Sequence, residues 1–124
     1  MDDRLRKEAG RAGESAALAH LEQAGLQLVR RNFRCKGGEI DLVMLDRATL
    51  VLVEVRYRSS EQFGGAAASV TWRKQRRLTN AAQYLLLRHR ELQRYPARFD
   101  VVAISATSPS GCMKIDWIKN AFTL

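Results

Sequence analysis

The sequence contains few cysteines, histidines and prolines, with two residues of each type among 124. Cys35 and Cys112 belong to no C-x-x-C pair, so neither a disulfide framework nor a zinc site is favoured. His20 and His89 lie far apart without metal-ligand spacing, and we interpret them as packed or solvated side chains. We find no Pro/Gly-rich linker, internal repeat or low-complexity tract, so we expect one domain spanning residues 1–124.

Long hydrophobic runs are also missing. The longest aliphatic runs, "LVLV" and "YLLL", fall far short of the ~20 residues that a membrane-spanning helix requires. The start of the chain, "MDDRLRKEAGR", has no apolar stretch of the signal-peptide type. We therefore expect a cytoplasmic protein that does not cross a membrane.

Positive charge is abundant and unevenly placed. The net charge is +8, and residues 73–98 contain eight basic residues against a single acid, Glu91. Such a concentration is typical of proteins that bind polyanions, and the alternative is a solvated basic helix. The segment has no apolar stripe of the membrane-surface type, which favours nucleic acid as the partner. The basic residues are Arg73, Lys74, Arg76, Arg77, Arg88, Arg90, Arg94 and Arg98.

Hydrophobic periodicity predicts two helices and five strands. A helix over residues 3–24 ends at Gly25, and a second helix covers about 67–92 after an exposed connection at 61–70. The order α-β-β-β-α-β-β predicts an α/β fold, a mixed β-sheet of about five strands flanked by helices. The expected strands are residues 26–34, the two strands of a hairpin within 37–59, residues 98–106, and a short strand at 112–120 after a turn at 107–111.

The hairpin within residues 37–59 combines a strong core pattern with ionisable residues. If "DRAT" (46–49) forms its turn, Asp41 lies opposite Glu54 and Glu39 lies opposite Arg56. These four residues share one face, which is apolar near the turn and ionisable at its far end. The other face is entirely apolar and must belong to the core; it consists of Ile40, Leu42, Met44, Val51, Val53 and Val55.

Two directly opposed carboxylates require a cation, a shared proton or full solvation. A hard divalent ion such as Mg²⁺ or Mn²⁺ is one solution, because carboxylate oxygens are its preferred ligands. The alternative is a surface charge ladder in which Arg56 pairs with Glu39 and Glu54. Two more residues interrupt apolar faces: Glu14 on the inward face of the first helix, and Lys74 on that of the second.

Several blocks of the chain resemble the YraN family of small bacterial proteins. They are "GRAGESAALAHLEQAGLQLVRRNFRCKGGEIDLVMLD", "LVLVEVRYRSSEQFG", "VTWRKQRRLTNAAQYL" and "RFDVVAI", and they run in family order from about Gly10 to Ile104. That family resembles the PD-(D/E)xK nuclease superfamily, whose restriction-endonuclease-like fold is shared by Holliday-junction resolvases. The resemblance implies this fold and phosphodiester hydrolysis.

Carried over to this chain, the superfamily aspartate is Asp41, the (D/E)-x-K motif is Glu54-Val55-Arg56, and the acid of the first helix is Glu14. The resemblance implies Mg²⁺ (or Mn²⁺) held by Asp41 and Glu54, with Glu14 as a direct or water-mediated ligand. Arg56 replaces the usual lysine, and arginine cannot act as a base because it stays protonated. It retains the ability to hold a phosphate, and Lys74 is the candidate for the lysine role.

We therefore expect a metal-dependent endonuclease acting on branched or structured DNA, with Arg73, Arg76 and Arg77 binding flanking phosphates. Trp72 has two interpretations: a core residue on a helix face, which is the commoner case, or a stacking surface for an unpaired base. A homodimer is expected by analogy with resolvases. The alternatives are a non-catalytic nucleic-acid-binding module with the same fold, and a basic adaptor that binds a protein.

Overall fold

The computed structural model of the chain describes residues 3–58, 70–106 and 113–122. It has the expected α/β order, so the predicted fold class is confirmed. The predicted connection at 61–70 (apart from Val70), the turn at 107–111 and Cys112 lie outside the described residues. The elements are α1 (Asp3–Gln23), β1 (Gln27–Cys35), β2 (Gly38–Asp46), β3 (Thr49–Arg58), α3 (Trp72–Arg88), the 3₁₀ helix η1 (Arg90–Arg94), β4 (Ala97–Ala106) and β5 (Met113–Phe122).

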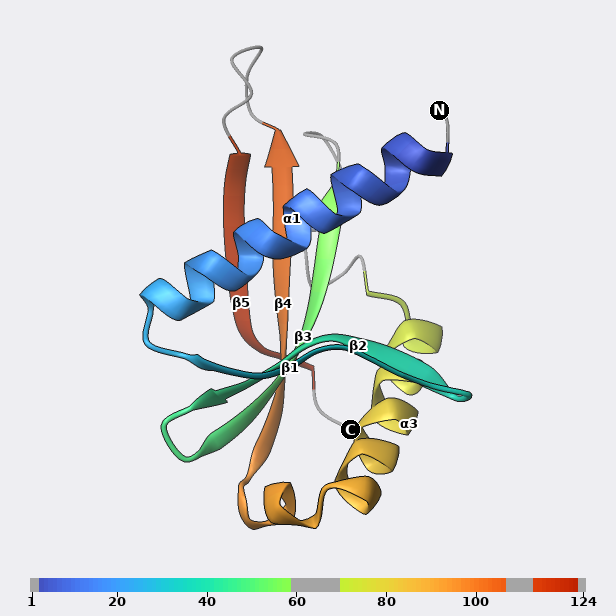
Figure 1. The fold of residues 1–124 in the computed structure, drawn as a ribbon, viewed down its shortest axis with the longest axis vertical. Helices are drawn as coiled ribbons and strands as arrows, with labels where there is room; N and C mark the ends of the chain where they lie inside the picture. Colours follow the sequence, from blue (N-terminus) through green and yellow to red (C-terminus); the bar gives the residue numbers. More distant parts are fainter. Residues whose placement is uncertain (1–2, 59–69, 107–112, 123–124) are drawn as a thin grey trace.

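The five strands form one mixed sheet in the order β1-β2-β3-β4-β5. Neighbouring strands are antiparallel except β3 and β4, which are parallel and are connected through α3. Figure 1 shows α1 crossing in front of β3, β4 and β5, whereas α3 lies beside β2. A parallel pair needs a long crossover connection, and α3 provides it.

Both faces of the β2–β3 hairpin are buried, each under its own helix. On the α1 side, Ala17 and Leu21 pack with Leu42, Met44, Val51 and Val53. On the α3 side, the helical residues Leu78, Ala81, Ala82 and Leu85 pack with Val43, Leu50 and Leu52. The prediction of one apolar core face is confirmed, and the second face is core near the turn because α3 covers it.

The two hairpin strands separate before they reach their ionisable ends. Their pairing has the predicted register, from Asp46 opposite Thr49 to Leu42 opposite Val53, and it stops there. Beyond that point β2 stays paired with β1 and β3 with β4, so the strands form a fork (Figure 1).

Two details of the predicted hairpin are wrong because of this fork. Glu39 does not lie opposite Arg56; it is paired with Arg34 of β1, and the Arg34 Nε–Glu39 Oε2 distance is 3.3 Å. Ile40 does not join the face of Leu42; it packs in the α3-side core with Phe33, its partner on β1. Beyond the fork, β2 pairs only with β1, and its residues no longer lie on the faces that the hairpin alternation predicts.

The second helix is shorter than predicted, and the last strand is longer. His89 ends α3 with its N–H donating to the Leu85 carbonyl (2.9 Å), and residues 90–94 continue as a 3₁₀ turn. Strand β5 reaches Phe122 because the fully buried Asp100 holds it in place. This carboxylate accepts hydrogen bonds from Trp117 Nε1 (2.9 Å), Asn120 N (2.8 Å) and Arg98 Nε (3.0 Å).

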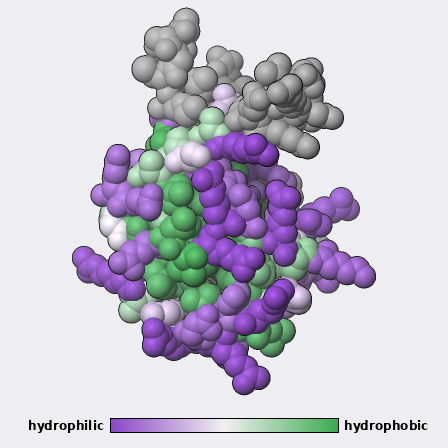
Figure 2. Space-filling model, in the orientation of Figure 1, coloured by the Kyte–Doolittle hydropathy of each residue, from purple (hydrophilic) through white to green (hydrophobic). Residues whose placement is uncertain are grey.

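Figure 2 shows hydrophilic side chains surrounding an apolar region on the face that α1 crosses. Among the described residues, no helix has the length and apolar character needed to cross a membrane.

Candidate active site in the fork between β2 and β3

Asp41 occupies the position where the two hairpin strands part. Its Oδ2 accepts a hydrogen bond of 2.8 Å from the backbone N–H of Val55. The carboxylate thereby takes the place of a carbonyl acceptor on a paired strand. A buried amide left without an acceptor is costly, so this bond also stabilises the fork.

Glu54 and Asp41 are joined by a side-chain hydrogen bond at this point. Burial raises the pKa of Asp41 to about 6, although the Val55 amide opposes the rise. Burial and the Asp41 charge raise the pKa of Glu54 to about 8, against the opposing charges of Lys74 and Arg56. The pair therefore shares a proton near neutral pH. The predicted proximity of these two acids is confirmed, but their predicted placement as a directly opposed pair on one face is wrong, because the β2–β3 pairing ends at Leu42 and Val53.

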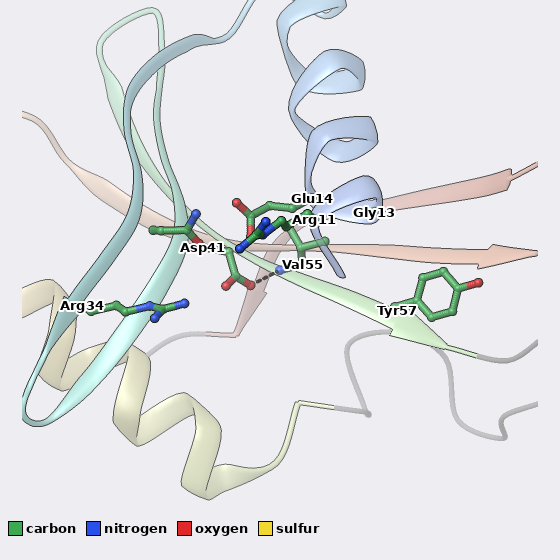
Figure 3. Close-up of a pocket in the computed structure, with 8 residues that line it drawn as sticks. Arg11, Gly13, Glu14, Arg34, Asp41, Val55 and Tyr57 are labelled. Atoms are coloured by element: carbon green, nitrogen blue, oxygen red, sulfur yellow. Dashed lines mark hydrogen bonds between the residues drawn. The ribbon is translucent and has the colours of Figure 1, made fainter. Parts of the chain in front are cut away.

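A cavity of about 690 Å³ opens beside Asp41 on the α1 side of the sheet. Figure 3 shows Arg11 and Glu14 descending from α1 toward Asp41, while Arg34 reaches in from β1 and Tyr57 lies farther along β3. Two guanidinium groups and two carboxylates line the cavity, so it can accommodate a polar group, and its arginines can bind an anion. Its full lining is Arg11, Gly13, Glu14, Asn32, Arg34, Asp41, Val55 and Tyr57.

Glu14 points inward as predicted, and its charge raises the pKa of Asp41. It is also paired, because Arg31 Nε donates to Glu14 Oε1 at 2.7 Å, and Arg31 Nη2 donates to Ser15 Oγ at 2.8 Å. Glu14 therefore lies in the same cavity as Asp41, with a cation already bonded to one of its oxygens.

A smaller hollow of about 60 Å³ opens beside Glu54 on the α3 side. Its lining includes Glu39, Lys74 and Arg77, so the predicted inward direction of Lys74 is confirmed. Asp41 and Glu54 thus contact each other through the fork while facing cavities on opposite sides of the sheet. Arg56 is partly buried on β3, close enough for its charge to lower the pKa of Glu54.

The first two turns of α3 carry the other predicted cations at the surface. Arg73, Arg76 and Arg77 are exposed, and the first turn contains no acid. Trp72 is also exposed, by 71%, so its interpretation as a core residue is wrong. Positive side chains at a helix N-terminus are electrostatically unfavourable, since the helix dipole is positive there. Fold stability alone therefore does not explain this cluster.

Four residues of the larger cavity were missed from the sequence: Arg11, Asn32, Arg34 and Tyr57. Arg11 precedes Glu14 by three residues, and that helical spacing was an available signal. The other three come from strands whose packing the sequence does not reveal.

The donor set suits a hard divalent ion, although it is small. Within the described ranges, no group of three or more His, Cys, Asp or Glu side chains is assembled for metal binding. Two contacting carboxylates that retain a proton can exchange it for a cation, and Mg²⁺ commonly uses one or two carboxylates plus water and substrate phosphate. Asp41 and Glu54 meet this requirement.

Comparison with known proteins places these residues within a bacterial family. The sequence profile described as "Uncharacterised protein family UPF0102" matches residues 13–104, which include Glu14, Asp41, Glu54 and Lys74. A UPF0102 protein of Pseudomonas putida KT2440 is 53% identical over 114 residues, covering 92% of this chain and 91% of the relative. Another, from Stutzerimonas stutzeri A1501, is 50% identical over 116 residues, covering 94% and 95%. A third, from Alcanivorax borkumensis SK2, is 49% identical over 119 residues, covering 96% and 94%.

Proposed function

We propose that this chain, which belongs to the UPF0102 family, is a metal-dependent endonuclease of the PD-(D/E)xK type that hydrolyses phosphodiester bonds in branched or structured DNA. The observation that carries the proposal is the contact between Asp41 and Glu54 in the strand fork, flanked by two cavities that each combine two cations with two acids. A buried acidic pair would otherwise weaken the fold. A cytoplasmic location, and a homodimer by analogy with resolvases, complete the proposal.

Asp41 and Glu54 would hold Mg²⁺ or Mn²⁺, and Glu14 would support it through water. When bound, the ion supplies Lewis acidity for water activation and positive charge for the phosphodiester. Asp41 is oriented by the Val55 N–H, which fixes one oxygen and leaves the rest of the carboxylate facing Glu54 and the cavity. Glu54 gives up its proton on ion binding, since a ligating carboxylate must be ionised.

The surrounding cations would hold the DNA backbone. Lys74 and Arg77 lie in the hollow with Glu54, where they can bind phosphate oxygens next to the reacting group. Arg11 and Arg34 provide the same charge on the α1 side, beside Asp41. Phosphate would also relieve the repulsion between the α3 dipole and the cations of its first turns.

The second candidate is a non-catalytic nucleic-acid-binding module, and Arg56 is the observation that favours it. A permanently protonated guanidinium at the motif position can bind phosphate but cannot accept a proton from water. Lys74, which acts electrostatically on Glu54 in the same hollow, is the residue that would compensate in an active enzyme.

Cleavage and binding assays separate the two candidates. Wild type should nick a labelled four-way junction in Mg²⁺ or Mn²⁺, while Asp41→Asn should lose turnover and keep its affinity for the junction. Equal nicking by wild type and Asp41→Asn would identify a contaminant and refute catalysis. Binding without nicking by either protein would support the non-catalytic module.

The basic residues of α3 are tested separately with a charge-matched control. Reversing Arg73, Arg76 and Arg77 to glutamate should weaken DNA binding and reduce the slope of log affinity against log salt by about 0.9 per lost phosphate contact. The control reverses three arginines near the other end of the helix, Arg88, Arg90 and Arg94. Equal loss in both triple variants would remove the α3 N-terminal cluster from the binding surface.

A further inference from the structure

Trp72 and Trp117 are the only two tryptophans in the sequence, and the surroundings of their side chains differ greatly. The Trp117 indole N–H donates to the buried Asp100 (2.9 Å), and its ring meets His20 edge-on with 6.2 Å between centroids. Packing within the domain therefore explains Trp117. Trp72 is 71% exposed at the first residue of α3, and the described core clusters do not include it. An indole is large and mostly apolar, so leaving it in water needs a reason outside the core.

The Trp72 ring is backed by a cation. The Cζ atom of Arg76 lies 5.4 Å from the ring centroid, four residues further along the helix, which is one turn. Arg76 covers the ring from one side. An aromatic ring with one face available and an arginine beside it is the arrangement on which proteins stack the bases of single-stranded nucleic acids.

This aromatic–arginine pair lies on the same two turns of α3 as two residues of the candidate active site. Lys74, two residues after Trp72, lines the hollow that contains Glu54, and Arg77 lines it one turn later. Arg73 and Arg76 are exposed on the same two turns. A strand whose phosphates follow these cations would bring its bases within reach of Trp72.

We propose that Trp72, supported by Arg76, stacks an unpaired base, so that the preferred substrate is DNA with a single-stranded segment next to the cleavage point. This inference rests on the proposed nucleic-acid function and narrows its substrate class. A blunt, fully paired duplex has its bases stacked internally and offers none to Trp72 at low cost. Stacking does not select a base sequence, because every base presents a π-face.

The test measures affinity for three fluorescein-labelled DNAs in EDTA, where metal-dependent cleavage does not occur: a 20-nucleotide single strand, a 20-base-pair blunt duplex, and a duplex with a single-stranded tail. Trp72→Ala should weaken binding of the single strand and the tailed duplex by roughly tenfold or more, and change the blunt duplex less than twofold. Trp72→Phe should keep most of the affinity. Leu87→Ala is the matched control, because Leu87 is 73% exposed on the same helix, and it should change none of the three.

Intrinsic fluorescence provides an independent readout. Adding the single strand to wild type should quench indole emission, and the quenching should disappear in Trp72→Phe, where Trp117 is the remaining indole. Circular dichroism of each variant checks that an exposed substitution leaves the fold intact.

The outcomes separate this inference from the function on which it rests. If wild type binds neither these three DNAs nor the four-way junction, the nucleic-acid function fails; if it binds the junction alone, the stacking site fails while nucleic-acid binding stands. If wild type binds but Trp72→Ala has unchanged affinity, or loses affinity equally for all three, the stacking site fails while nucleic-acid binding stands. Selective loss of the single strand and the tailed duplex supports the stacking site.

Discussion

Replacing Asp41 with asparagine should stabilise the protein at neutral and alkaline pH, although it removes a proposed metal ligand. Asparagine keeps a side-chain oxygen that accepts the hydrogen bond from Val55 N, so the fork stays satisfied. It also removes a buried charge beside Glu54, which is one cause of the high pKa of that residue. The buried acidic pair of the proposed site therefore lowers the stability of the fold, as is common at active sites.

The magnitude follows from the raised pKa values. The pKa of Asp41 rises from 3.8 to about 6 in the folded protein. At about 1.4 kcal/mol per tenfold change in proton affinity, the ionised form is disfavoured by about 3 kcal/mol. The folded state holds more protons on the pair than the unfolded chain between about pH 4 and pH 8. The free energy of unfolding of wild type therefore decreases as the pH rises through that range.

The assay is urea denaturation of wild type and Asp41→Asn in EDTA from pH 4.5 to 8.5. The variant should be more stable than wild type by about 1 kcal/mol at pH 4.5, where the Asp41 carboxyl of the unfolded chain is already mostly ionised, and by about 3 kcal/mol at pH 8.5. The control is Glu22→Gln, which neutralises an exposed carboxylate on α1 and should show no such trend. A variant that is less stable than wild type at pH 8.5, or a difference that does not change with pH, would refute the buried acidic pair.

Metal binding, two glycines and a buried aspartate give three further predictions. Mg²⁺ binding at pH 7 should release about one proton, measured by titration calorimetry in buffers of different ionisation enthalpy, and Glu54→Gln should abolish this release. Gly38→Ala should cost about 3 kcal/mol or more in thermal unfolding, because a Cβ there would overlap the backbone carbonyl of Arg77 in α3. Gly13→Ala should be tolerated, or should stabilise α1 by up to about 1 kcal/mol, because its Cβ would lie at ordinary contact distances of 3.5 and 3.6 Å from its neighbours. Equal effects of Gly38→Ala and Gly13→Ala would contradict the close approach of β2 to α3. Asp100→Ala should cost about 3–5 kcal/mol, since it removes the acceptor shared by Trp117 Nε1, Asn120 N and Arg98 Nε, although Asp46 still accepts from Arg98 Nη2; a loss below about 1 kcal/mol would contradict that account.

Binary patterning was enough to predict the fold class and the hairpin register. The apolar alternation on either side of the Asp46–Thr49 turn admits one pairing, because a shift by one residue would exchange the two faces. Patterning did not reveal where the strands separate. The position of Glu39 and the core assignment of Ile40 were wrong for this reason, since both lie on the part of β2 that follows β1.

The candidate site was predictable where it depended on local geometry. The proximity of Asp41 and Glu54 and the inward direction of Lys74 follow from strand and helix periods. That the two acids face opposite sides of the sheet does not, because it depends on where the strands separate. Arg34 and Tyr57 could not be found in this way, because they reach the cavity from different strands through the twist of the sheet. Sequence periodicity also does not distinguish an exposed aromatic residue from a buried one at a helix start, which is why the commoner core interpretation of Trp72 is wrong.

The hydrogen bond from Val55 to Asp41 has a consequence for how the relatives of this protein are read. The side chain at position 41 accepts a main-chain hydrogen bond and also lines the cavity. Selection for folding alone therefore favours an oxygen acceptor there, even in relatives without nuclease activity. Among the described contacts, the Glu54 side chain accepts no hydrogen bond from a main-chain amide. Asparagine at position 41 therefore marks only the shared architecture, whereas acids at positions 41 and 54 together would mark a relative that has the proposed activity.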